Sequence, residues 1–169
     1  TKIADEDDMV QLSGKIALIT GAGQGVGQGI ALAMAAAGAT VLVTGRTLEK
    51  LEKTVAMIAE RGGVGHAMTC NVKSADDLAH IVAEAQERFG GIDILVNNAQ
   101  EVPNGPLLDV TDEAFLAGFE SGPLASFRLM KLVQPIMKAR GGGTIKREGA
   151  TCSWCFFFVC VQGEGRGVS

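Results

Sequence analysis

Tyrosine is absent from this 169-residue sequence, and tryptophan occurs once. No phenolic hydroxyl can therefore take part in the chemistry of this chain. No apolar run approaches the roughly 20 residues of a membrane helix, and no apolar stretch follows a basic start as in a signal peptide. Nineteen acidic against 15 basic residues give a net charge of −4, which offers no general attraction to nucleic acid or anionic membranes. A soluble cytoplasmic protein is expected, with no nucleic-acid or membrane partner.

The four cysteines lack the pattern of a secreted disulfide scaffold. Cys70 stands alone, whereas Cys152, Cys155 and Cys160 cluster near the end. A zinc site requires four ligands, and a redox pair requires a thioredoxin-like helix N-terminus. Neither context is present, so no metal is expected. The alternative is a hydrophobic strand from Cys155 to Val161 that covers an exposed edge at the fourth strand of the sheet.

Apolar segments alternate with amphipathic ones, which indicates βαβ units and a parallel sheet. The right-handed crossover rule then favours a doubly wound, Rossmann-like α/β fold. Strands are expected at 16–20, 41–43, 65–71 and 92–97, and helices at 25–37, 48–61, 75–89 and 112–139. The last helix should be kinked at Gly122-Pro123.

The character of the sequence changes after Gly143. Charged residues at 146–148 stand where a buried fifth strand should run. The sheet is therefore expected to end after the fourth or fifth strand. The predicted organisation is an acidic N-terminal arm at 1–11, a nucleotide-binding domain at 12–143, and an atypical Cys- and Phe-rich tail at 144–169.

A glycine-rich segment from Thr20 to Gly27 joins the first predicted strand to the first helix. Glycines allow a sharp turn and a close approach of the backbone to a pyrophosphate. The following helix N-terminus offers unpaired N–H groups to the anion. Such a pattern alone is a weak signal in a chain with 23 glycines, and an ordinary tight turn is the alternative. Its position within the first βαβ unit favours dinucleotide binding.

Three motifs in sequence order resemble those of the short-chain dehydrogenase/reductase family, over about residues 12–143. They are Gly21-x-x-x-Gly25-x-Gly27 after Thr20, Asn71-Val72 after the third strand, and Asn97-Asn98-Ala99-Gln100 at the end of the fourth. Gln100 replaces the family's usual glycine. The resemblance implies an oxidoreductase that transfers hydride between a nicotinamide dinucleotide and a carbonyl or alcohol.

The resemblance also implies which residues surround the cofactor. The loop would hold the pyrophosphate, the segment after the third strand would flank the adenine, and the segment after the fourth would support the nicotinamide ribose. The residues so implied are Thr20, Gly21, Gln24, Gly25, Val26, Gly27, Asn71, Val72, Asn98 and Ala99.

The end of the second strand bears on the choice of cofactor. Gly45 stands where NAD-binding folds carry an acid for the ribose 2′-hydroxyl, and Arg46 follows it. An acid there would repel a 2′-phosphate, whereas a guanidinium can pair with one. The sequence therefore favours NADP over NAD, with a solvated loop charge as the alternative for Arg46.

The family's catalytic group of Ser, Tyr and Lys, usually helped by Asn, transfers a proton at the substrate oxygen. Ala150 falls about where the Ser belongs, Gly122 aligns with the Asn, and Ser153 lies in an unrelated context. No catalytic residue is therefore assigned, and this chain is predicted to be inactive.

Three functional hypotheses remain open. The first is an NADP-dependent oxidoreductase, which would act on a small carbonyl or alcohol only if complete and could form a homo-oligomer. The second is a non-catalytic nucleotide-binding or interaction protein derived from a truncated or frameshifted oxidoreductase. The third is a misfolding-prone fragment without a role. A gene that encodes Tyr-x-x-x-Lys in another frame after Thr144 would support the frameshift.

Overall fold

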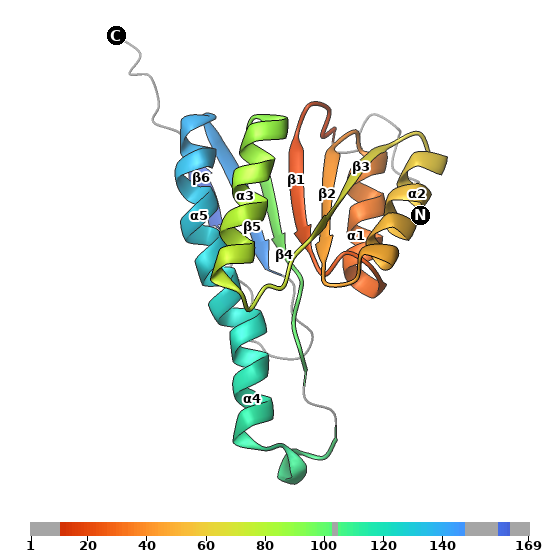
Figure 1. Ribbon diagram of the computed structural model, residues 1–169. Coiled ribbons are helices and arrows are strands. Elements are labelled where there is room, and N and C mark those ends of the chain that lie inside the picture. Colours follow the sequence, from red (N-terminus) through yellow and green to blue (C-terminus); the bar gives the residue numbers. More distant parts are fainter. Residues whose placement is uncertain (1–10, 103–104, 148–158, 163–169) are drawn as a thin grey trace, which may run out of the picture.

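The computed structural model describes residues 11–102, 105–147 and 159–162, which form an α/β fold around one sheet (Figure 1). The strands lie in the order β3-β2-β1-β4-β5-β6. Their bounds are Ile16–Thr20 (β1), Thr40–Gly45 (β2), Val64–Thr69 (β3), Ile94–Asn97 (β4), Gly142–Arg147 (β5) and Val159–Gln162 (β6). The first five are parallel, and β6 is antiparallel to β5. The predicted doubly wound, Rossmann-like sheet is confirmed.

Helices cover both faces of this sheet. Their bounds are Gly25–Ala36 (α1), Leu48–Glu60 (α2), Ala75–Phe89 (α3), Leu107–Asp109 (η2, a 3₁₀ turn), Asp112–Phe119 (α4), Glu120–Leu124 (η3, a π-helical turn) and Ala125–Ala139 (α5). No described helix combines the length and the apolar character needed to span a bilayer.

Alternate strand residues enter two separate cores. Ala17 and Ile19 of β1 pack on the side of α1 and α2, whereas Ile16 and Leu18 pack on the side of α3 and α5. Both faces of β1 are consequently buried. Burial on both faces explains why the strands read as continuous apolar runs rather than as alternating ones.

The parallel part of the sheet reaches a fifth strand, which is one of the two ends that the sequence allowed. β5 runs through Lys146 to Arg147 and pairs in register with β4, with Ile145 opposite Leu95. Side chains alternate along it, so Ile145 is buried and Lys146 is exposed. A charged residue is compatible with a strand when its side of the sheet is open to solvent.

The partner predicted for the hydrophobic C-terminal strand was wrong. Because β5 already pairs with β4, the free edge belongs to β5, and β6 covers it with Gly143 opposite Val161. Residues 155–158 of the predicted strand lie outside the described residues.

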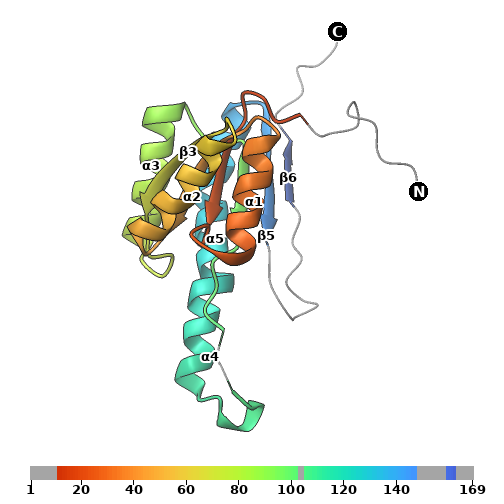
Figure 2. The same ribbon diagram turned by 90° about the vertical axis from the view of Figure 1, so that its right-hand side faces the viewer.

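The long helix continues through Gly122-Pro123 as the π-helical turn η3. Proline has no N–H to donate and its ring crowds the preceding turn, and a wider turn accommodates both effects. Figures 1 and 2 show α4 projecting beyond the carboxyl edge of the sheet, while α5 runs back along the sheet.

Asp93 ties three elements together at the opposite, amino edge. Its carboxylate accepts the N–H of Ile16 at 2.9 Å and the Nε and Nη2 of Arg140 at 3.1 and 3.0 Å. Burial works to raise the pKa of Asp93, but the hydrogen bonds from Arg140 and Ile16 outweigh it and hold that pKa below its usual value. The carboxylate therefore stabilises the folded state only while it is ionised.

Asp93→Asn is expected to lower the free energy of unfolding by about 2–4 kcal/mol, because it leaves Arg140 without its charged partner. The measurement is urea unfolding at neutral pH. The depressed pKa makes this stabilisation fully present above about pH 4 and lost as pH falls through the folded-state pKa. The gap between the variant and the wild type should therefore narrow in acid. Asp109→Asn, at an exposed position in η2, is the control, and equal unfolding midpoints for both variants would contradict the prediction.

Candidate dinucleotide-binding site

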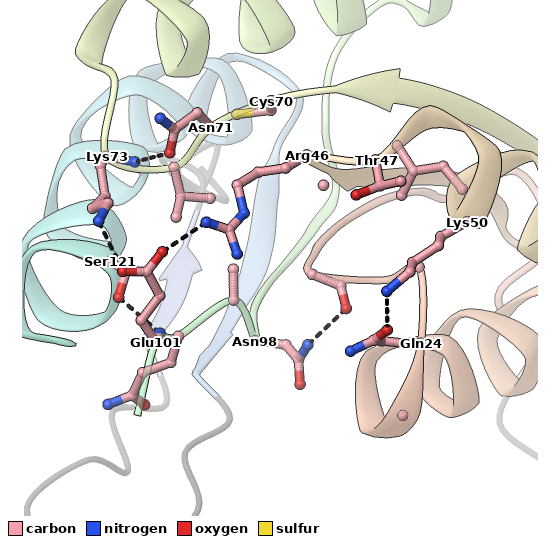
Figure 3. A pocket seen from close by; sticks show the side chains of 18 residues that line it. Gln24, Arg46, Thr47, Lys50, Cys70, Asn71, Lys73, Asn98, Glu101 and Ser121 are labelled. Carbon is pink, nitrogen blue, oxygen red and sulfur yellow. Dashed lines mark hydrogen bonds and ion pairs between the residues drawn. The ribbon is translucent and has the colours of Figure 1, made fainter. Parts of the chain in front are cut away.

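A pocket of about 320 Å³ lies at the carboxyl ends of the central strands (Figure 3). The strand β1 lies between β2 and β4 in the sheet. The chain crosses from β1 to β2 on one side of β1 and later returns to β4 on its other side. Ligands of doubly wound sheets bind at such a switch point. Predicted site residues among its lining are Gly21, Gln24, Gly25, Arg46, Asn71, Val72, Asn98 and Ala99.

The remaining predicted residues lie close to the pocket without lining it. The Thr20 side chain is buried between β1 and β4, and Gly27 is buried in the first turn of α1. Val26 is 68% exposed.

Thr20 fastens the glycine loop to the end of β4. Its Oγ1 accepts the N–H groups of Asn98 and Ala99, each at 3.0 Å, and donates to the carbonyl of Val96 at 3.4 Å. The Asn98 amide returns the contact by donating Nδ2 to the carbonyls of Thr20 and Gly21 at 3.0 and 3.2 Å. Two segments far apart in sequence thus form one rigid floor.

The glycines of the loop meet two different requirements. Gly21 and Gly25 have positive φ values of 66° and 59°, a conformation that costs other residues free energy. Gly27 is required for space, because a Cβ there would lie 2.4 Å from Asn98 Nδ2 and 2.5 Å from the Gly21 carbonyl oxygen. Any other residue at these positions would therefore strain the loop.

The N-terminus of α1 opens beside the pocket. Its N-cap residue, Gln24, directs its side chain to Lys50, whose Nζ donates to Gln24 Oε1 at 2.6 Å. The first N–H groups of a helix favour an anion. A phosphate at this position would meet these N–H groups together with the ammonium of Lys50.

An ion-pair network crosses the pocket. Glu101 Oε1 lies 2.7 Å from Arg46 Nη1, and its Oε2 lies 2.8 Å from Lys73 Nζ. The pKa of Glu101 lies below its usual value. The hydrogen bond from Lys73 is the main cause, and Arg46 adds to the effect. The network holds the Glu101 carboxylate in its ionised form.

Sequence reasoning missed Lys50, Lys73, Glu101 and Ser121, all of which line this pocket. Charged loop residues follow no hydrophobic period, so pattern analysis gives them no weight. One signal was available for Lys73, which directly follows Asn71-Val72, the pair that was expected to flank an adenine.

Cys70 lies in the lining after β3, but its thiol is not poised to react. Burial raises the pKa of Cys70 to about 12, and the nearby Asp77 carboxylate adds to the shift. Nucleophilic cysteines require the thiolate. Cys70 therefore packs as a small apolar side chain.

The positions at which the family carries catalytic groups are altered or lie elsewhere. Ala150 and Ser153 lie outside the described residues. Gly122 lies in η3, where a Cβ would come within 2.9 Å of Arg147 Nη2. The small residue thus leaves room for the guanidinium of Arg147, which is only 9% exposed.

Two polar groups at this end of β4 and β5 are not satisfied. Arg147 Nη2 and Asn97 Nδ2 are buried and have no hydrogen-bond partner in the described part of the chain. The two residues face each other in the β4–β5 register. A buried donor that has no partner costs about 1–3 kcal/mol.

This architecture is shared with a known protein family. The model of the short chain dehydrogenase family matches residues 15–146. The chain belongs to the short-chain dehydrogenase/reductase family. The match covers the glycine loop, the ion-pair network and most of β5.

Curated members of the short-chain dehydrogenase/reductase family align with most of this chain. Mouse dehydrogenase/reductase SDR family member 4 is 35% identical over 147 residues, which cover 86% of this chain and 53% of the mouse protein. The 7alpha-hydroxysteroid dehydrogenase of Escherichia coli strain K12 is 37% identical over 138 residues, which cover 82% of this chain and 54% of that enzyme. The chain spans about half the length of these relatives.

Solved structures of the short-chain dehydrogenase/reductase family share the fold. A 7α-hydroxysteroid dehydrogenase in complex with NADH and 7-oxo glycochenodeoxycholic acid has 35% identity and a TM-score of 0.78, covering 85% of this chain and 56% of that one. The L-sorbose reductase of Gluconobacter frateurii, in complex with NADPH and L-sorbose, has 32% identity and a TM-score of 0.76, covering 82% and 53%. These relatives include one bound to each type of cofactor, so the likeness does not distinguish NADP from NAD.

Gly27→Ala is expected to lower the free energy of unfolding by about 1–3 kcal/mol, because the added methyl group has no space in the rigid floor. The matched control is Gly29→Ala, two residues further along α1, where an added Cβ meets nothing within 4 Å. That change should raise stability by about 0.5–1 kcal/mol, as alanine favours the helix over glycine. Thermal and urea unfolding measure both effects, and stabilisation by both substitutions would contradict the assigned role of Gly27.

Arg147→Met is expected to raise the free energy of unfolding by about 1–3 kcal/mol, because it removes an unpaired buried donor and keeps a long apolar side chain. Arg61→Met, at an exposed position after α2, should change it by less than about 0.5 kcal/mol. Urea unfolding of the three proteins measures this. A less stable Arg147→Met variant would show that the guanidinium has a favourable partner after all.

Proposed function

We propose that the pocket binds a nicotinamide dinucleotide. The observation that carries this proposal is the rigid loop from Thr20 to Gly27, whose glycines bring the backbone and the α1 N-terminus to the same point. In this proposal the N-terminus of α1 would hold the pyrophosphate, Arg46 and Val72 would flank the adenosine, and Asn98 would support the nicotinamide end. A volume of about 320 Å³ falls within the usual range of small-ligand pockets, about 300–1,000 Å³.

NADP is the preferred cofactor in this proposal. Gly45 presents no carboxylate at the end of β2, and Arg46 and Lys73 supply two cations at the adenosine side of the pocket. A guanidinium binds a phosphate with two parallel hydrogen bonds, which an ammonium cannot do. The discrimination between NADP and NAD should depend on Arg46.

The whole protein is proposed to be an oxidoreductase that acts on a carbonyl or alcohol, as the names and bound substrates of its relatives suggest. The dinucleotide supplies or accepts the hydride. The 169-residue chain contributes the cofactor half of this reaction and, having no tyrosine, is proposed to bind without turnover. This function is assigned to the domain proposed at 12–143, and β5 continues the sheet beyond that boundary to Arg147.

The 169-residue chain is expected to bind NADPH more tightly than NADH. Arg46→Gln should weaken NADPH binding by about tenfold, because a charge-assisted hydrogen bond contributes about 1.5–3 kcal/mol, and should change NADH binding less than about twofold. Arg61→Gln, which removes the same charge after α2, should change neither affinity. Titrations that follow nicotinamide fluorescence measure all three proteins.

Folded wild-type protein that ignores both dinucleotides at millimolar concentration would contradict the proposed function. Equal binding of both would contradict the preference for NADP alone. Absorbance of NADPH, followed with a ketose and with a steroid ketone as substrates, should remain constant. Steady oxidation in that assay would show that the chain carries a proton donor other than tyrosine.

A further inference from the structure

Among the described residues that line the pocket, Glu101 is the only acidic one, and it lies among cations. Its two carboxylate oxygens are divided between Arg46 at 2.7 Å and Lys73 at 2.8 Å. Three segments thus meet at one carboxylate, from the ends of β2, β3 and β4 (Figure 3). Cationic side chains around one anionic group are the arrangement expected around a bound phosphate. Here the carboxylate of Glu101 takes the place of the phosphate.

The Arg46–Glu101 pair spans the site instead of lying along one wall. Arg46 follows β2 and Glu101 follows β4, and β1 lies between these strands in the sheet. The pair must therefore pass over the carboxyl end of β1, from which the glycine loop starts. A dinucleotide on that loop lies in the path of this ion pair.

The two partners differ in how firmly they are held. The backbone N–H of Glu101 donates to Ser121 Oγ at 2.8 Å, and that hydroxyl donates to the carbonyl of Ala117 at 2.9 Å. The Arg46 side chain is 65% exposed, against 34% for Glu101. Glu101 is thus fixed to the long helix, and Arg46 is the partner that can move toward a ligand.

We infer that Glu101 is a specificity-determining residue, whose carboxylate competes with a ribose 2′-phosphate for Arg46 and Lys73 and so reduces the preference for NADP over NAD. The inference rests on the proposed binding of a dinucleotide in this pocket. The 2′-phosphate must break the Arg46–Glu101 pair and then lies near a like charge. The neutral 2′-hydroxyl of NAD meets neither obstacle.

The test compares NADPH and NADH binding by the wild-type 169-residue chain and by Glu101→Gln. The variant should bind NADPH about fivefold more tightly, because an exposed ion pair that no longer has to be broken contributes up to about that factor. Its affinity for NADH should change less than twofold, as judged by the same conversion. The matched control is Glu87→Gln, an exposed carboxylate toward the far end of α3, which should change neither affinity.

Two further measurements separate competition from a structural role. Raising the salt concentration should shrink the difference between wild type and Glu101→Gln for NADPH, since exposed charges are screened. In a double-mutant cycle, Glu101→Gln should gain less NADPH affinity when Arg46 is already glutamine, because the pair to be broken is gone. Glu101→Asp, which keeps the charge on a shorter side chain, serves as the second variant and should fall between glutamate and glutamine.

An unchanged ratio of NADPH to NADH affinity in Glu101→Gln, with binding intact, would overturn this inference and leave the proposed function standing. Weaker NADPH binding by that variant would also overturn it, since Glu101 would then be assisting the 2′-phosphate. Absence of binding to either dinucleotide in every variant would overturn the proposed function and the inference together.

Discussion

The buried hydroxyl of Thr20 is the contact on which the pocket depends. Its Oγ1 accepts two half-buried backbone N–H groups directly after β4 and so joins that segment to the end of β1. In doing so it fixes the distance between the glycine loop and the segment that carries Asn98 and Glu101. The close approach of Gly27 to Asn98, and the reach of Glu101 to Arg46, both follow from that fixed distance.

Local signals in the sequence predicted most of the fold. β1 has the bounds that its apolar run indicated, and Ser74 caps α3 by accepting the N–H of Asp77 at 3.1 Å, because both features are decided by neighbouring residues. The sequence left open whether a fifth strand forms, since the formation of β5 depends on pairing with β4 and on which side of it faces solvent.

The candidate site likewise has one part that the sequence predicts and another part that it does not. The glycine loop could be predicted because the residues that form it follow one another in the sequence. The network of Arg46, Lys73 and Glu101 could not, because its members come from three loops that only the sheet order brings together. The Gly122–Arg147 contact is similar in kind: a missing side chain on η3 and an added charge on β5 are separate oddities in the sequence, and only packing shows that one makes room for the other.

The net charge of this protein is negative, whereas most of the charged side chains at the pocket are positive. A net charge of −4 gives no reason to expect an anionic ligand, yet the pocket gathers Arg46, Lys50 and Lys73 around a helix N-terminus. Fields within a cleft are set by nearby groups, because charges beyond about 10 Å are screened by salt. Glu101 is therefore the acid that matters to a ligand, despite being one of 19 acidic residues. Its backbone N–H donates to Ser121 Oγ in η3, so the position of that acid in the candidate site depends on the π-helical turn.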